Sequence, residues 1–244
     1  MKKGFFYGSE SFQANGGLNR SGKSGQNSYT MTWNNTLTYD NIFNEHHITL
    51  DAITEIQNYQ YDEMSAEGRN LDVEQLLYHN LGTNTENQKI GSGYSNWALA
   101  SFMGRVRYDY QGKYLANISV RSDGSSRLAK GNQWATFFSG GLAWRISEEP
   151  FMKNIGWISN LKLRYAYGTV GNQAIDPYST LAGLGSYGYQ FGEGGKGLYA
   201  YRPDKLVNKN LGWEITHTNN IGLDFGLFLS LIHISEPTRP LYIS

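Results

Sequence analysis

The sequence predicts an all-β fold of antiparallel strands, each with one apolar and one polar face. Three observations support this prediction. Aromatic residues make up 14% of the 244 residues, whereas the hydrophobic fraction is only 39%. Apolar and polar side chains alternate with period two in about seven segments, which is the pattern of half-buried strands. The connections alternate between short and long, as they do in transmembrane β-barrels.

The seven predicted strands follow one another along the chain at residues 29–39, 48–61, 97–110, 114–123, 133–146, 161–167 and 213–228. The first shows the alternation most clearly, with Tyr29, Met31 and Trp33 on one face and threonines between them. Residues 40–45 and 111–113 are expected to form short turns. Longer connections are expected at residues 62–95, with a short helix near 71–78, at residues 124–132, and at residues 169–210, a loop rich in glycine and tyrosine.

Charged side chains interrupt the polar faces in the middle of the predicted strands, at Arg105, Arg107, Arg121 and Arg164. A dry core does not hold such charges unpaired, whereas the water-filled lumen of a barrel solvates them. Tyrosine and tryptophan near the strand ends of the apolar face are typical of an aromatic girdle. The pattern alone leaves two folds open: the wall of a transmembrane barrel, and a soluble β-sandwich or open sheet.

The composition and motifs argue against several classes of function. Lys plus Arg and Asp plus Glu number 21 each, and binding nucleic acid requires an excess of basic charge. The sequence holds no cysteine, no nucleotide-binding or serine-hydrolase motif, and no histidine at metal-ligand spacing from acidic residues. The glycine-rich segment 192–197 lacks the residues that follow in a phosphate-binding loop. We therefore expect no enzyme, catalytic residue, metal or cofactor.

Five motifs occur in order along the second half of the chain. They are Tyr108–Leu115 (YDYQGKYL), Arg121–Arg127 (RSDGSSR), Trp144–Phe151 (WRISEEPF), Leu161–Asn172 (LKLRYAYGTVGN) and Asn208–Asp224 (NKNLGWEITHTNNIGLD). Together they resemble the SusC/RagA family of TonB-dependent outer-membrane transporters, although Leu128 stands where the family usually has phenylalanine. An architectural role is expected for the matching residues Arg121, Asp123, Gly124, Ser125, Ser126, Arg127, Trp144, Glu149, Pro150, Trp213, Glu214, Asn220, Gly222 and Asp224.

This resemblance implies a partial antiparallel transmembrane β-barrel, with about seven strands of a barrel of roughly 22. It also implies a place in the Gram-negative outer membrane, in contact with lipid, and energised import of glycans or oligopeptides. The implied partners are a SusD-like surface lipoprotein and TonB, which would act through a plug and a TonB-contacting segment that this sequence lacks. Two alternatives stay open: a TonB-dependent receptor for siderophores or cobalamin, and a soluble or surface carbohydrate-binding β-sandwich.

The resemblance covers residues 27–228, which we interpret as the partial barrel, with residues 1–26 as a loop or preceding strand region. Met1 is expected to be internal, because the polar residues after Lys3 provide no apolar core for a signal peptide. Residues 229–239 (LSLIHISEPTR) are identical to the translation of a transposase adapter used to build sequencing libraries. Residues 229–244 are therefore predicted to be a non-native tail.

Aromatic residues in the long glycine-rich loop are the best candidates for contacting a substrate. Aromatic faces stack on sugar rings, and arginine or aspartate side chains hydrogen-bond to hydroxyl groups. The alternative is that these side chains only pack the loop against itself. The candidates are Tyr187, Tyr189, Phe191, Tyr199, Tyr201, Arg202 and Asp204.

Overall fold

A computed structural model describes residues 1–14, 17–189, 198–206, 208–227, 230–237 and 241–242. The strands are β1 (Lys2–Tyr7), β2 (Arg20–Phe43), β3 (His46–Leu71), β4 (Asn84–Tyr110), β5 (Tyr114–Ser125), β6 (Trp134–Arg145), β7 (Ile158–Asn172), β8 (Gly183–Tyr189), β9 (Leu198–Lys205), β10 (Glu214–Leu227), β11 (Ser230–Pro237) and β12 (Leu241–Tyr242). Four single 3₁₀ turns interrupt them: η1 (Phe12–Ala14), η2 (Glu74–Leu76), η3 (Leu81–Thr83) and η4 (Ile146–Glu148). No helix in the described ranges has the length and apolar character needed to cross a membrane.

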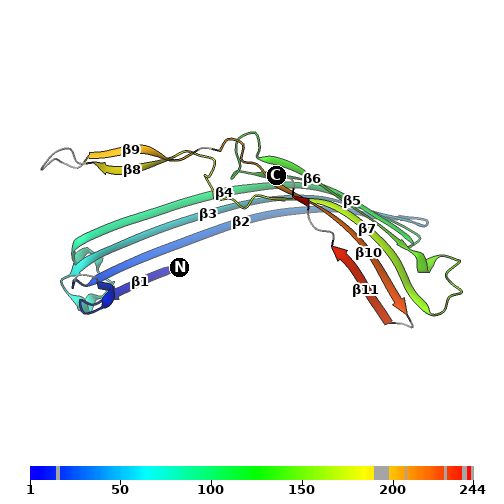
Figure 1. The fold of residues 1–244 in the computed structure, drawn as a ribbon, viewed down its shortest axis with the longest axis horizontal. Helices are drawn as coiled ribbons and strands as arrows, with labels where there is room; N and C mark the ends of the chain where they lie inside the picture. Colours follow the sequence, from blue (N-terminus) through cyan, green and yellow to red (C-terminus); the bar gives the residue numbers. More distant parts are fainter. Residues whose placement is uncertain (15–16, 190–197, 207, 228–229, 238–240, 243–244) are drawn as a thin grey trace. The chain divides into compact units, whose positions relative to one another are not determined.

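One sheet contains most of the strands, in the order β1-β2-β3-β4-β5-β6-β7-β10-β11, with β12 beside β10 (Figure 1). The order follows the sequence except that β8 and β9 leave the sheet as a separate hairpin. The chain divides into two compact units, residues 1–31 with 58–97 and residues 32–57 with 98–244. The all-β antiparallel fold is confirmed, and the seven predicted strands are β2 to β7 and β10.

Two predicted loops contain more strand than expected, and residues 1–26, predicted as a loop or preceding strand region, contain strand as well. Within the predicted loop 62–95, β3 continues to Leu71 and β4 already begins at Asn84, and the predicted helix is only the turn η2. The predicted loop 169–210 includes the β8–β9 hairpin, and residues 1–26 include β1 and the start of β2. Period-two alternation requires one apolar face, so a strand that is polar on both faces pairs normally but gives no such signal.

The first unit is held together by polar contacts near the ends of β2 and β3. Arg20 and Glu67 form an ion pair at 2.7 Å. The side-chain amide of Asn19 donates to the Leu71 carbonyl at 3.0 Å and to the Glu74 carboxylate at 2.8 Å. Ser21, fully buried, donates to the side-chain oxygen of Asn84 at 3.0 Å. These contacts pair polar side chains over residues where the sequence predicted a loop.

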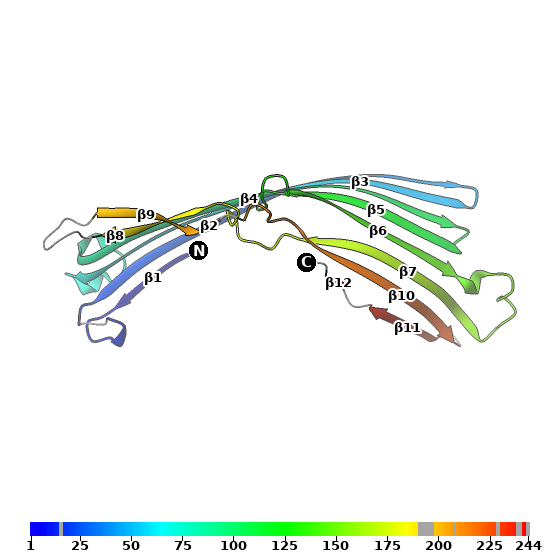
Figure 2. The ribbon, with the colours of Figure 1, turned by 45° about the horizontal axis from the view of Figure 1, so that its top comes forward.

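In the second unit, β4 to β7 and β10 form an antiparallel meander (Figure 2). The turn between β4 and β5 places Gln111 (φ 56°) and Gly112 (φ 66°) in the left-handed region, which suits the twist of a tight hairpin. The Asp109 carboxylate accepts a hydrogen bond from the Gly112 amide at 2.6 Å. This turn explains why the connection is short and fixes the register of the two strands.

The apolar face of this unit is exposed rather than covered by protein. Ile118 is 62% exposed, although it lies in the middle of β5. Strands β4, β6, β7 and β10 add apolar side chains on the same face, because each strand pairs in register with the next, outward from β5. The exposed members include Val106, Val120, Phe138, Leu142, Leu163, Ile221 and Leu223. An uncovered apolar surface of this extent indicates contact with another apolar medium.

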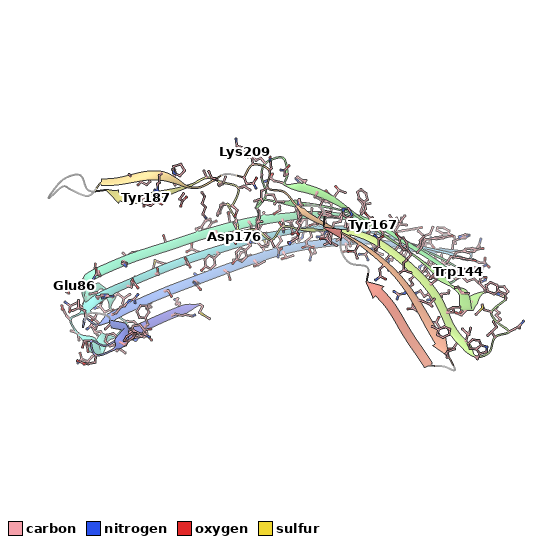
Figure 3. The ribbon with its side chains drawn as sticks, in the orientation of Figure 1. Glu86, Trp144, Tyr167, Asp176, Tyr187 and Lys209 are labelled. Carbon is pink, nitrogen blue, oxygen red and sulfur yellow. The ribbon has the colours of Figure 1, made fainter. Side chains whose placement is uncertain are left out.

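Two groups of aromatic residues border this apolar surface. At the short-turn end, Tyr114 stacks with Tyr110 and with Trp144, both at 6.3 Å between ring centroids (Figure 3). Toward the other end, Phe102 and Trp134 stack at 6.1 Å, and Trp134 pairs with Gly124 of β5. Tyr114 and Gly124 are ten positions apart on β5. At about 3.3 Å per residue and a strand tilt of about 40°, this separation spans about 25 Å, the height of the apolar band of an outer-membrane barrel.

Candidate functional site

The polar face of the second unit carries charges in pairs. Arg107 on β4 contacts Asp51 on β3 at 3.2 Å, and Asp51 is only 8% exposed. Thr38 donates a further hydrogen bond to Asp51 at 2.9 Å. Across the sheet, Arg164 on β7 and Asp224 on β10 lie 3.0 Å apart. The face opposite the apolar band is therefore polar and carries paired charges, as the face toward a water-filled lumen can.

A shallow cavity of about 420 Å³ lies on the sheet between these two ion pairs. Its floor is formed by small residues of β6 and β7, Gly141, Ala143 and Ala166. Gly222, one of the predicted motif residues, lies next to the Arg164 guanidinium, where an added Cβ would approach it to 2.8 Å. The glycine thus leaves room for Arg164 to reach Asp224, which supports an architectural role for this motif.

The aspartate of the motif Arg121–Arg127, Asp123, is held by hydrogen bonds from Arg121. Asp123, 8% exposed, accepts two hydrogen bonds from the Arg121 Nε, at 2.7 and 3.0 Å. The Arg121 guanidinium also donates to the Ser101 hydroxyl of β4 at 3.0 Å. Arg121 thus holds Asp123 within β5 and, through Ser101, ties β4 and β5 together near the end of β5.

A second motif residue, Glu149, closes the short-turn end of β5 and β6. Its carboxylate accepts hydrogen bonds from the Tyr114 hydroxyl at 2.6 Å and from the Trp144 indole at 3.1 Å. The Lys113 ammonium lies 3.8 Å from the other carboxylate oxygen. These contacts, chiefly the Tyr114 hydrogen bond, lower the pKa of Glu149 below its ordinary value. The charged form of Glu149 thus fixes two rings of the aromatic girdle.

We expect Glu149→Gln to destabilise the folded receptor at pH 7 by removing this charge. Because the folded-state pKa is lowered, the stabilising contribution is present above the ordinary pKa of about 4.3 and is lost as the pH falls through the folded-state value. The difference in urea midpoint between wild type and variant should therefore disappear below about pH 4, where Glu149 becomes protonated in the wild type. The exposed neighbour Glu148 provides the control variant Glu148→Gln. A difference between Glu149→Gln and wild type that does not change with pH would contradict this assignment.

At the opposite end of the strands, two connections are clamped to each other. The Ala129 amide donates to the Leu211 carbonyl at 3.1 Å. The Trp213 indole donates to the Gln133 carbonyl at 2.9 Å. Trp213 also packs edge-on against Phe137 at 5.5 Å, and Phe137 is only 5% exposed. The connection before β6 and the connection before β10 thus form one supported structure.

A pocket of about 430 Å³ lies on this supported structure, which we call the loop pocket. Its residues come from the three connections β5–β6, β7–β8 and β9–β10: Ser126, Leu128, Ala129, Lys130, Gln133, Tyr178, Thr180, Leu181 and Lys209. Leu128 and Ala129 are 2% and 5% exposed. Among these residues, the sequence motifs had pointed only to Ser126, as a motif residue, and to Leu128, as a departure from the motif. The apolar pair Leu128-Ala129 inside a polar loop was the available signal for the pocket.

The predicted aromatic candidates lie elsewhere, on the β8–β9 hairpin. The Arg202 guanidinium stacks on the Tyr187 ring at 3.8 Å, and the Asp204 side chain lies near Gly185, beside that ring. Tyr201 pairs with Ser186 and is 71% exposed, so it projects from the other face of the hairpin. Phe191 lies outside the described residues, as do the side chains of Tyr189 and Tyr199. The structure brings together three of the seven candidates, and their contact with a substrate stays a prediction.

The remaining motif residues have structural surroundings as well. The Asn172 side chain donates to the Glu214 carboxylate at 3.3 Å, which links the ends of β7 and β10. Asn220 pairs with Ala166 in the register of these two strands. Pro150 follows the turn η4. The described residues contain no group of three or more His, Asp or Glu side chains arranged to hold a metal ion.

Comparison with known proteins shows which proteins this chain resembles. No protein-family model matches the chain. A TonB-dependent receptor of Formosa agariphila is 35% identical over 214 residues, which are 85% of this chain and 20% of that protein. The TonB-dependent receptor SusC of Bacteroides thetaiotaomicron is 42% identical over 131 residues, which are 52% of this chain and 13% of that protein. The chain belongs to the SusC/RagA family of TonB-dependent receptors.

The fold comparison agrees with this family. The structure of the RagAB peptide transporter matches with a TM-score of 0.84 and 23% sequence identity, over 94% of this chain and 25% of that chain. The sheet therefore has the fold of part of the β-barrel wall of that structure. The chain spans about a fifth of the length of the curated relatives it matches. All these relatives are named as receptors or transporters, which agrees with the expectation that the chain is not an enzyme.

Proposed function

We propose that this chain is part of the wall of an outer-membrane active transporter that imports glycans or oligopeptides with energy delivered through TonB. The observation that carries this proposal is the band of exposed apolar side chains between the Tyr114 and Trp134 aromatic groups, opposite a face of paired charges. One face suits lipid and the other suits a wet lumen. The short turns then face the periplasm, and the long connections face the outside of the cell.

In this arrangement the loop pocket lies on the side from which substrate arrives. A SusD-like surface lipoprotein would deliver the substrate there, and TonB would act from the periplasmic side. The wall contributes a rigid frame, because the clamps through Ala129 and Trp213 fix the connections to the strands. The chain performs no chemistry on the substrate.

The proposal is tested with the complete receptor in a Gram-negative host that lacks its own copy. We expect uptake of labelled oligosaccharides or oligopeptides that stops when TonB is deleted or a protonophore is added. The control is the same host carrying a receptor without the TonB-contacting segment. Uptake that continues without TonB, or uptake confined to ferric chelates or cobalamin, would contradict the proposed function.

A further inference from the structure

The loop pocket combines an exposed leucine with cationic side chains and lacks an acidic lining. Leu128 and Ala129 are almost fully buried and support the pocket from below, so the aliphatic surface open to a ligand is that of Leu181, which is 58% exposed. Lys130 and Lys209 line the pocket from two different connections, and both are exposed (Figure 3 labels Lys209). Neither Asp nor Glu lines this pocket. In the described part of the chain, no carboxylate lies within 4.0 Å of either ammonium group.

The pocket lysines differ from three arginines of the polar face. Arg107, Arg121 and Arg164 are each paired with an aspartate of this chain. The two pocket lysines have no such partner among the residues that the structure describes. The formal net charge of the chain is zero, so the acidic residues that balance these lysines lie outside the pocket. The pocket itself is therefore positive and suited to a negatively charged ligand.

The pocket is also a built feature rather than an accidental gap between loops. Its floor is held by the backbone hydrogen bond from Ala129 to Leu211 and by the Trp213 indole on Gln133. Its wall includes Tyr178 with φ 66°, a conformation that non-glycine residues rarely adopt. The Leu181 amide donates to the Tyr178 carbonyl at 2.9 Å and closes the turn that presents this residue.

The exposed side chain of Leu181 distinguishes between the two chemical classes of substrate. A sugar carries hydroxyl groups on nearly every carbon, and hydroxyl groups lose hydrogen bonds with water against leucine. A peptide that carries an apolar side chain next to a carboxylate satisfies both Leu181 and the lysines. We propose that the loop pocket binds acidic oligopeptides, with an apolar side chain on Leu181 and carboxylates at Lys130 and Lys209. This inference rests on the proposed function, since it assigns a substrate class to the same transporter.

Binding to the purified complete receptor in detergent, without TonB, tests this inference. The probe is a fluorescent pentapeptide that alternates leucine with aspartate, compared with the same peptide containing asparagine in place of aspartate. We expect the double variant Lys130→Gln/Lys209→Gln to bind the acidic peptide about tenfold more weakly, because each exposed ion pair contributes only a few-fold. The difference should shrink at high salt, which screens exposed charges. Lys153→Gln, an exposed lysine in the connection between β6 and β7, is the matched control.

Four outcomes would overturn the inference: no binding of the acidic peptide, equal binding of the asparagine peptide, no effect of the double variant, or equal competition by an oligogalacturonate. The last outcome would indicate an acidic glycan as the ligand. TonB-dependent uptake of a glycan by a receptor that does not bind the acidic peptide would leave the proposed function intact and reject only the peptide assignment. Binding of the acidic peptide by a receptor whose uptake does not depend on TonB would leave the peptide assignment intact and reject the proposed function.

Discussion

Replacing Ile118 by arginine is expected to destabilise the folded receptor by about 2–4 kcal/mol in a lipid bilayer, the cost of an arginine on the lipid-facing side of a barrel near the bilayer midplane. Ile118 lies between the two aromatic groups of β5 and β6, about midway along the strand, and is 62% exposed on the apolar face. The added guanidinium would lie in hydrocarbon without a partner. The measurement is the urea midpoint for folding of the complete receptor into lipid vesicles.

The adjacent residue supplies a control on the opposite face of the sheet. Asn117 pairs with Arg107 and Gly141 on the polar face. Asn117→Arg places the same side chain in the wet lumen opposite Arg107, where the like-charge contact should cost at most about 1 kcal/mol. Equal effects of the two substitutions would mean that the two faces meet the same medium, and the assignment of a lipid-facing band would fail.

The positions of the strands in this band could be predicted from the sequence because each residue there has a distinct environment. Lipid requires apolar side chains on one face and water tolerates polar ones on the other, so period two is imposed on segments such as 114–123. The same reasoning explains the errors at 62–71 and 84–95. There the contacts are polar, as between Arg20 and Glu67, and the alternation disappears although backbone pairing continues.

The candidate site was less accessible to sequence reasoning because it depends on contacts between distant segments. The Ala129 amide reaches Leu211, and the Trp213 indole reaches Gln133, across separations of about 80 residues that no local pattern records. Residues 124–132 were predicted as a polar loop, so the buried pair Leu128-Ala129 went unassigned. The motif resemblance did identify Trp213 and Arg121, but as parts of the framework and not of a pocket.

Phe137→Ala is expected to have the largest effect on stability among the substitutions considered, a loss of about 3–5 kcal/mol, typical of a buried phenylalanine. Phe137 is 5% exposed, packs edge-on against Trp213, and fills the space in front of Gly171, whose added Cβ would approach the ring to 2.1 Å. Removing the ring leaves a cavity between β6, β7 and the connection before β10. The Trp213 indole then loses the surface that holds it on Gln133.

The next residue, Phe138, provides a control variant that separates this packing effect from the general effect of losing an aromatic side chain. Phe138 is 56% exposed on the apolar face, so Phe138→Ala opens no cavity within the protein and should cost much less. Hydrogen exchange adds a local readout, because the Ala129 amide is bonded to Leu211 only while the clamp is intact. We expect this amide to exchange faster in Phe137→Ala and unchanged in Phe138→Ala. Equal stability losses with a protected Ala129 amide in both variants would show that Phe137 does not support the loop pocket, and that the pocket is held by the strands alone.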